Sequence, residues 1–114
     1  MDARLPPTMP PHVRAALAEA KAWLAAHYGE RLERVVLYGS HARGDAGPDS
    51  DLDLLVVLRG GYEPYAEIKG TLPLYHELLD RYDVLVSIQP YSEGEAADLG
   101  NPFMWNVADE GVEV

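Results

Sequence analysis

The residues best placed to do chemistry are a Gly-Ser pair and two aspartates that follow it. Ten residues separate Gly39-Ser40 from Asp51, and Asp53 stands two positions after Asp51. In a β-strand, residues two apart point to the same side and lie roughly 6.5–7 Å apart, so both carboxylates can face one site. Carboxylate oxygens are hard ligands that suit Mg²⁺, which takes its other ligands from water and substrate phosphates. The aspartates therefore predict a metal site at the end of a strand.

The Gly39-Ser40 pair predicts the complementary half of such a site. Glycine lets a phosphate approach the backbone, and the following N–H and hydroxyl groups can donate hydrogen bonds to its oxygens. With nine aspartates in the chain, an Asp-x-Asp pattern should arise by chance roughly 0.7 times and is uninformative alone. Requiring Gly-Ser at this one upstream spacing lowers the chance expectation to roughly 0.002. The two halves together therefore favour a functional site.

A third acidic residue, Asp83, stands at the start of the next candidate strand. Alternation along that strand places Asp83, Leu85 and Ser87 on the face opposite Val84 and Val86. Asp83 is therefore a candidate ligand that reaches the same metals from a neighbouring strand. The competing interpretation is the solvated end of a strand, where charged residues are common.

Periodic segments are expected to position these residues. Apolar side chains recur at helical spacing from Pro11 to Tyr28, so a helix is predicted there. The remaining pattern predicts strands at 35–38 and 52–58, joined by a turn-rich connection over 41–50 that begins with one helical turn. A broken helix or two short ones are predicted over 63–81, followed by a strand over 82–88 that Pro90 stops. A C-terminal helix and tail are predicted around 101–114. Strands separated by helical segments indicate an α/β or α+β fold, in which helices cover a small sheet.

The length and the net charge of the chain exclude several classes of function. The 114 residues suit one domain, 1–114, with no separate substrate-recognition domain. A net charge of −10 with only 9 Lys and Arg argues against a DNA or RNA template, because binding many phosphates needs a basic surface. No apolar run is long enough for a membrane span, and the N-terminus lacks a signal-peptide pattern. With zero cysteines, these features favour a cytoplasmic protein.

The chain resembles the DNA polymerase β-like nucleotidyltransferase superfamily, specifically its minimal, antitoxin-type members. The matching segments are LYGSHARGDAGPDSDLDLLVVL, RYDVLV and the ending NPFMWNVADEGVEV, and the resemblance extends over nearly the whole chain. The resemblance implies a small mixed sheet covered by helices, and transfer of AMP from ATP with Mg²⁺ or Mn²⁺. It assigns triphosphate binding to Gly39 and Ser40, and metal binding to Asp51 and Asp53. Asp83 becomes the third carboxylate, which activates the incoming hydroxyl.

Other residues of the motif keep two interpretations. Arg43 falls where the family has an arginine in the turn, and nucleotide contact and loop bracing stay equally open. Ser50 also matches the family as a nucleotide-binding candidate, although capping its own turn is favoured. His41 is expected to be an exposed loop histidine, and Tyr38 a core residue.

The sequence alone does not identify the molecule that accepts the nucleotide. In the antitoxin-type relatives, the acceptor is a tyrosine of a helical HEPN ribonuclease toxin, and the resemblance implies the same partner here. One alternative is a small-molecule nucleotidyltransferase, which normally needs an additional substrate-binding domain. The other is a non-catalytic module that neutralises its partner by contact alone. Assembly as a homo-oligomer or a hetero-oligomer stays open.

Overall fold

Helix α1 (Pro11–Tyr28) has the bounds that its apolar periodicity predicts. The computed structural model describes residues 5–98 and 100–114, so residues 1–4 and 99 of the expected domain lie outside the described residues. All six apolar positions identified from the sequence are buried: Val13, Ala16, Leu17, Ala20, Leu24 and Tyr28. The helix ends at Gly29, which has a φ of 57°, and a short 3₁₀ turn (Gly29–Arg31) leads into the sheet.

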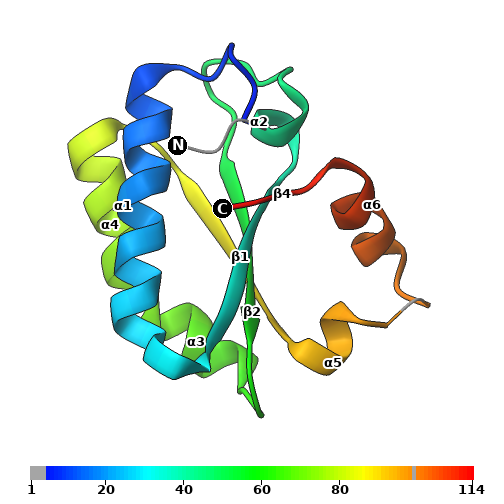
Figure 1. The fold of residues 1–114 in the computed structure, drawn as a ribbon. Helices are drawn as coiled ribbons and strands as arrows, with labels where there is room; N and C mark the ends of the chain where they lie inside the picture. Colours follow the sequence, from blue (N-terminus) through cyan, green and yellow to red (C-terminus); the bar gives the residue numbers. More distant parts are fainter. Residues whose placement is uncertain (1–4, 99) are drawn as a thin grey trace.

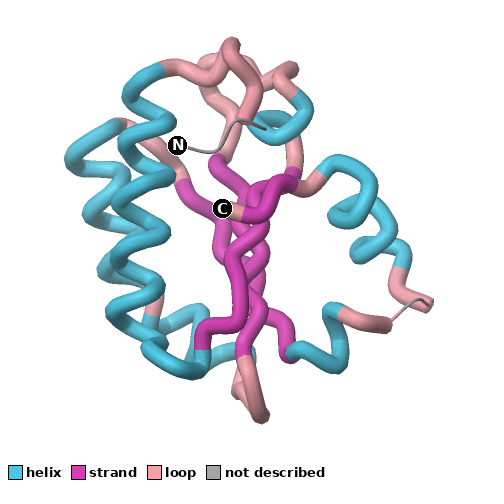
Figure 2. Tube along the Cα trace, in the orientation of Figure 1, coloured by secondary structure: helices cyan, strands magenta, loops and turns pink. Residues whose placement is uncertain are grey.

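The sheet has four strands in the order β3-β2-β1-β4 (Figure 2). The strands are β1 (Leu32–Tyr38), β2 (Leu52–Leu58), β3 (Val86–Ser92) and β4 (Val112–Glu113). Strand β1 is antiparallel to both of its neighbours, β2 and β4, whereas β2 and β3 are parallel. The sheet is therefore mixed, as the family resemblance implies.

Helices cover both faces of the sheet, which explains the continuous hydrophobicity of β2. Leu54 and Val56 point to one face and pack in the larger apolar cluster with α1 and α4 (Leu72–Tyr82). Leu55 and Val57 point to the other face and pack with Met104 of α6 (Pro102–Glu110). The two layers lie on opposite sides of the strands in Figure 1. The prediction that both faces of this strand are covered is confirmed.

The segment after β2 forms two helices, as its interruptions predict. Helix α3 (Pro64–Gly70) is capped by Thr71, whose hydroxyl donates to the carbonyl of Ile68 at 2.9 Å. Helix α4 begins at Leu72, so Pro73 falls in its first turn. A proline in that turn loses no hydrogen bond within the helix, because the first N–H groups of a helix have no partner there.

The third strand lies further along the chain than the pattern predicts. The expected strand over 82–88 is wrong at both ends, because α4 continues to Tyr82 and β3 runs from Val86 to Ser92. The Tyr82 hydroxyl donates to Glu19 at 2.9 Å, which ties the end of α4 to α1. Pro90 lies within the strand instead of stopping it, and an edge strand tolerates a proline because one side of its backbone is unpaired.

The C-terminal segment contributes to both a helical layer and the sheet. A helical turn, α5 (Glu93–Ala96), follows β3, and α6 is the helix predicted near the C-terminus. The predicted tail is partly a strand, since β4 pairs with β1 through Glu113 opposite Val36 and Val112 opposite Leu37. No helix in the described part of the chain is long and apolar enough to cross a membrane.

Candidate active site where β1 and β2 end

Gly39 joins β1 to the predicted phosphate-binding turn in a conformation that favours glycine. Its φ is 77° and its ψ is −158°, a region that residues with a Cβ essentially do not occupy. A Cβ at this position would also collide with Oδ2 of Asp53 and lie 3.2 Å from its Cγ. The absence of a side chain therefore lets the turn and the carboxylate of Asp53 lie directly against each other.

One helical turn, α2 (Ser40–Arg43), follows this glycine. The carbonyl of Gly39 accepts hydrogen bonds from the N–H groups of Ala42 and Arg43, both at 3.1 Å. The first N–H groups of a helical turn have no carbonyl partner within it, so they suit an anionic ligand. This geometry is compatible with the phosphate binding predicted from the sequence, which stays a prediction.

The two aspartates lie at the start of β2, beside that turn. Asp51 is exposed and immediately precedes the strand, while Asp53 is half-buried and pairs with Tyr38 across the antiparallel strands. Burial raises the pKa of the Asp53 carboxyl, and the negative charge of Asp51 raises it further. The two carboxylates therefore repel each other in this protein, which is the electrostatic condition that a bound cation relieves.

This donor set fits a magnesium ion that takes its remaining ligands from solvent and substrate. Mg²⁺ is usually bound by one or two carboxylates together with waters and phosphates, and Asp51 and Asp53 supply two. Within residues 5–98 and 100–114, no three His, Asp or Glu side chains are grouped closely enough to hold a metal ion. Metal binding by Asp51 and Asp53, predicted from the sequence, therefore stays a prediction.

Asp83 occupies a different position from the one that the sequence predicts. It does not open a strand but ends α4, in a left-handed conformation with φ 56° and ψ 39°. Aspartate tolerates this conformation better than most residues, and the Asp83 N–H donates to the carbonyl of Leu79 at 3.0 Å. The residue in register with Asp53 on β3 is Ser87, whereas Asp83 precedes the strand, which begins at Val86.

Arg43 braces the loop in this structure. Its guanidinium binds Asp45 at 3.2 Å through Nε, and Glu110 of α6 at 2.8 Å through Nη1. Ser50 closes its own turn by accepting a hydrogen bond from the Gly47 N–H at 2.9 Å, as the favoured interpretation expects. Glu110 was not identified from the sequence, because an ion pair between distant segments leaves no local pattern.

The expectation of an exposed His41 is wrong. This side chain is only 5% exposed, and its Nε2 lies 3.4 Å from the carbonyl oxygen of Ser50. His41 thereby connects α2 to the end of the loop that leads to the aspartates. Tyr38 packs its ring edge-on against Phe103 of α6, with centroids 5.2 Å apart. Burial, followed by the charge of Asp53, raises the pKa of Tyr38 to about 12.

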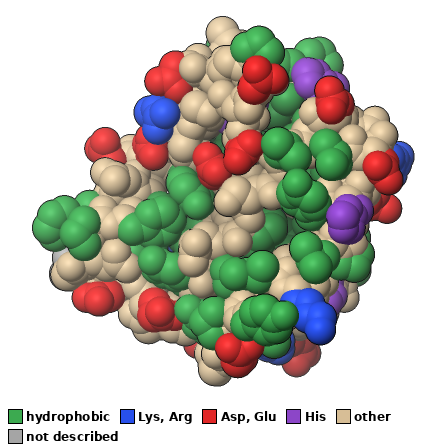
Figure 3. All heavy atoms as spheres, turned by 180° about the vertical axis from the view of Figure 1, so that it is seen from behind, with side chains coloured by type: hydrophobic (Ala, Val, Ile, Leu, Met, Phe, Trp, Pro, Cys, Tyr) green, Lys and Arg blue, Asp and Glu red, His purple; other side chains and the backbone are tan. Residues whose placement is uncertain are grey.

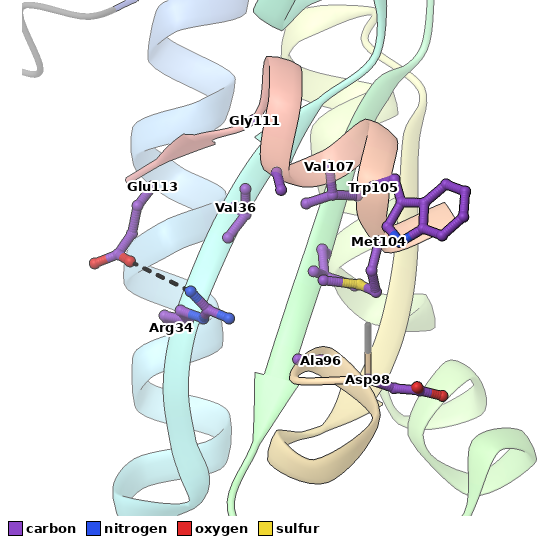
Figure 4. A pocket seen from close by; sticks show the side chains of 11 residues that line it. Arg34, Val36, Ala96, Asp98, Met104, Trp105, Val107, Gly111 and Glu113 are labelled. Carbon is purple, nitrogen blue, oxygen red and sulfur yellow. Dashed lines mark ion pairs between the residues drawn. The ribbon is translucent and has the colours of Figure 1, made fainter. Parts of the chain in front are cut away.

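A separate cavity of about 280 Å³ lies between β1, β2, α5 and α6 (Figure 4). Its lining includes Met104, Trp105 and Arg34, and Arg34 forms an ion pair of 4.0 Å with Glu113. Neither Asp51 nor Asp53 belongs to this lining. The candidate active site is the one at the aspartates, where Gly39 lies directly against the Asp53 carboxylate.

Comparison with known proteins shows the family of this chain. Residues 20–102 match the family described as "Nucleotidyltransferase domain", and the chain belongs to that family. A protein of Methanocaldococcus jannaschii named as a candidate protein adenylyltransferase is 31% identical over 85 residues, covering 75% of this chain and 81% of the relative. A second protein from the same organism, with the same kind of name, is 40% identical over 70 residues, covering 61% and 64% respectively.

Solved structures show the same fold. A structure described as a candidate minimal nucleotidyltransferase is 30% identical, has a TM-score of 0.60, and is matched over 93% of this chain and 97% of its own. A mutant of the toxin–antitoxin complex MntA–HpeT has a TM-score of 0.58 at 16% identity, over 83% of this chain and 69% of that one. The family expected from the sequence motif is thereby confirmed, and the protein is a nucleotidyltransferase of the minimal type.

Proposed function

We propose that this enzyme transfers AMP from ATP to a tyrosine hydroxyl of a HEPN ribonuclease toxin, and so acts as an antitoxin. The observation that carries the nucleotidyl transfer is the contact between Gly39 and Asp53, which joins a phosphate-binding turn to a metal-binding carboxylate. The names of the M. jannaschii relatives support a protein acceptor. The fold shared with a toxin–antitoxin complex supports a toxin as the partner.

Each residue of the site has a defined part in this reaction. The backbone of Gly39 and the N–H and hydroxyl groups of Ser40 would bind the triphosphate, while Asp51 and Asp53 would hold Mg²⁺ or Mn²⁺ through their carboxylate oxygens. A divalent cation, when bound, neutralises charge that develops on the phosphate oxygens. The tyrosine oxygen then attacks the α-phosphorus in line, its bond to phosphorus forms, and the bond to the departing pyrophosphate breaks.

Asp83 remains the proposed acceptor of the tyrosine proton by family resemblance. It is exposed at the end of α4, so a protein acceptor could reach its carboxylate. Ser87 lies in register with Asp53 and is also exposed, but a hydroxyl is a far weaker base than a carboxylate. Substituting Asp83 and Ser87 separately therefore shows which of the two side chains accepts the proton.

The surroundings of the site suit an acceptor that arrives on another protein. On β3, the side chains of Ser87, in register with Asp53, and of Gln89 are exposed, as is Leu85 just before the strand. In Figure 3, Asp and Glu are spread over the face seen from behind, and Lys and Arg are sparse. An acidic surface, with a net charge of −10 for the chain, favours encounter with a ribonuclease that is basic enough to bind RNA.

The test is to incubate the protein with the product of its neighbouring gene, ATP and Mg²⁺, and to weigh the partner by intact mass spectrometry. We expect mass increases in units of AMP, located on a tyrosine by peptide mapping. Asp51→Asn and Asp53→Asn should abolish the increase, because asparagine keeps the volume of aspartate but loses its charge. Asp49→Asn is the matched control, since this exposed aspartate precedes the motif, and it should retain activity.

The outcomes separate the competing functions. An unmodified partner whose toxicity is nevertheless suppressed would show inhibition by binding alone. Nucleotide transfer to a small molecule, with no protein acceptor, would replace this proposal with the small-molecule alternative. If Asp83→Asn keeps wild-type turnover, Asp83 is not the proton acceptor.

A further inference from the structure

A salt bridge connects the C-terminal helix to the phosphate-binding turn. Nη1 of Arg43 donates to Oε2 of Glu110 at 2.8 Å, and the Glu110 side chain is only 18% exposed. Asp45 accepts from Nε of the same guanidinium at 3.2 Å and is 62% exposed. Shielded, charge-assisted pairs hold their geometry better than exposed pairs, which compete with water and salt. Glu110 is therefore the partner that fixes the direction of the guanidinium.

The backbone of Glu110 is itself held in place. Glu110 ends α6, and the following Gly111 donates its N–H to the Val107 carbonyl at 2.7 Å. Gly111 packs so closely on β1 that a Cβ there would lie 2.7 Å from Cγ1 of Val36. Val112 then pairs with Leu37 of β1. The carboxylate of Glu110 is thus anchored to the strand that leads directly into Gly39.

We infer that Glu110 is a positioning residue for nucleotide binding, which orients Arg43 so that its remaining N–H groups face the triphosphate. A guanidinium has five N–H donors; the two carboxylates use one on Nη1 and one on Nε, which leaves donors for phosphate oxygens. The Arg43 N–H donates to the Gly39 carbonyl at 3.1 Å, and Gly39 lies directly against the Asp53 carboxylate, so Arg43 begins one helical turn away from the two aspartates. This inference rests on the proposed function, since it requires binding of metal and ATP.

Two substitutions that neutralise a carboxylate on the same guanidinium provide the test. Glu110→Gln and Asp45→Asn each remove one negative charge and keep the side-chain volume. Charge repulsion alone would make both variants bind an anionic nucleotide more tightly. Loss of positioning would instead weaken nucleotide binding, and only in the Glu110→Gln variant. We expect Glu110→Gln to raise the Kd about ten-fold, as for a weakened charge-assisted contact, and Asp45→Asn to leave it unchanged or lower.

The Kd is measured by isothermal titration calorimetry with Mg²⁺ and α,β-methylene-ATP, an analogue that binds without transferring its nucleotide. A double-mutant cycle isolates the coupling: adding Glu110→Gln to Arg43→Ala should change the Kd less than two-fold, because Glu110 acts through Arg43. Melting temperatures without nucleotide monitor the fold of each variant. Glu110→Asp, which keeps the charge but shortens the side chain, provides a second variant and should also weaken binding.

The results distinguish this inference from the function on which it rests. Tighter or unchanged binding by Glu110→Gln overturns the positioning role, as does a full ten-fold loss in the Arg43→Ala background. If the wild-type protein binds no nucleotide with metal present, the proposed function fails and this inference fails with it.

Discussion

Replacing Gly39 by alanine tests whether the turn and the carboxylate form one unit. The Gly39 backbone occupies a region, φ 77° and ψ −158°, that is essentially restricted to glycine, and holding another residue there costs about 1–3 kcal/mol. The new Cβ also collides with the Asp53 carboxylate. We expect a loss of about 2 kcal/mol in the free energy of unfolding, which leaves a folded protein because domains are stabilised by about 5–15 kcal/mol.

Urea denaturation with an unchanged m-value measures this loss, and it corresponds to a fall in Tm of roughly 8–16 °C for a domain of about 100 residues. Gly47→Ala is the matched control, since Gly47 lies in the same loop, has no positive φ, and leaves a new Cβ with no neighbouring atom within 4 Å. This control should stay within about 0.5 kcal/mol of wild type.

Gly39→Ala should cost more free energy in nucleotide binding than in unfolding, because the displaced Asp53 is also a proposed metal ligand. Adding Asp53→Ala should recover part of the stability loss, since the colliding carboxylate is then gone. The reasoning is refuted if Gly39→Ala unfolds at the same urea concentration as wild type. Equal destabilisation by Gly47→Ala would refute it as well.

Other perturbations address the charge, the core and the caps. Asp53→Asn should stabilise the metal-free protein at pH 7. Since folding raises the pKa of Asp53, the gain should shrink as the pH falls through this raised pKa and vanish below the ordinary Asp value, in urea titrations at each pH. Leu55→Ala, at a fully buried position under α6, should cost about 2–5 kcal/mol in the same assay. Ser92→Ala removes the capping box of α5 and should cost about 1 kcal/mol. Excess Mg²⁺ with ATP should raise the Tm, and EDTA should abolish the rise.

The sequence predicts the fold where structure follows from local periodicity. The bounds of α1 are predicted because every third or fourth residue is apolar, and those of β2 because an unbroken apolar run requires burial on both faces. The proximity of Gly39-Ser40 to Asp51 and Asp53 is also predicted, because all of these residues lie within one strand-turn-strand segment. Their roles in metal and phosphate binding remain proposals.

Features that depend on contacts between distant segments were not predicted. The pattern YDVLVSI reads as one strand, but the contact of Tyr82 with Glu19 extends α4 and shifts Asp83 out of the strand. Burial of His41 depends on how α2 folds against the loop that ends at Ser50. The ion pair between Arg43 and Glu110 joins two helices that no sequence period relates. Two residues of β4 are too few to show alternation.

The two outer strands of the sheet also bear on pairing with a second chain through the sheet edges. An exposed edge with a full row of N–H and C=O groups is a template for pairing with another chain, and long edges of this kind promote aggregation. At one edge, β4 has only two residues, which gives a second chain little to pair with. At the other, Pro90 removes one N–H group from the middle of β3. Replacing Pro90 with valine would restore that donor, so the same residue that misleads strand prediction would help keep the enzyme from aggregating at high concentration.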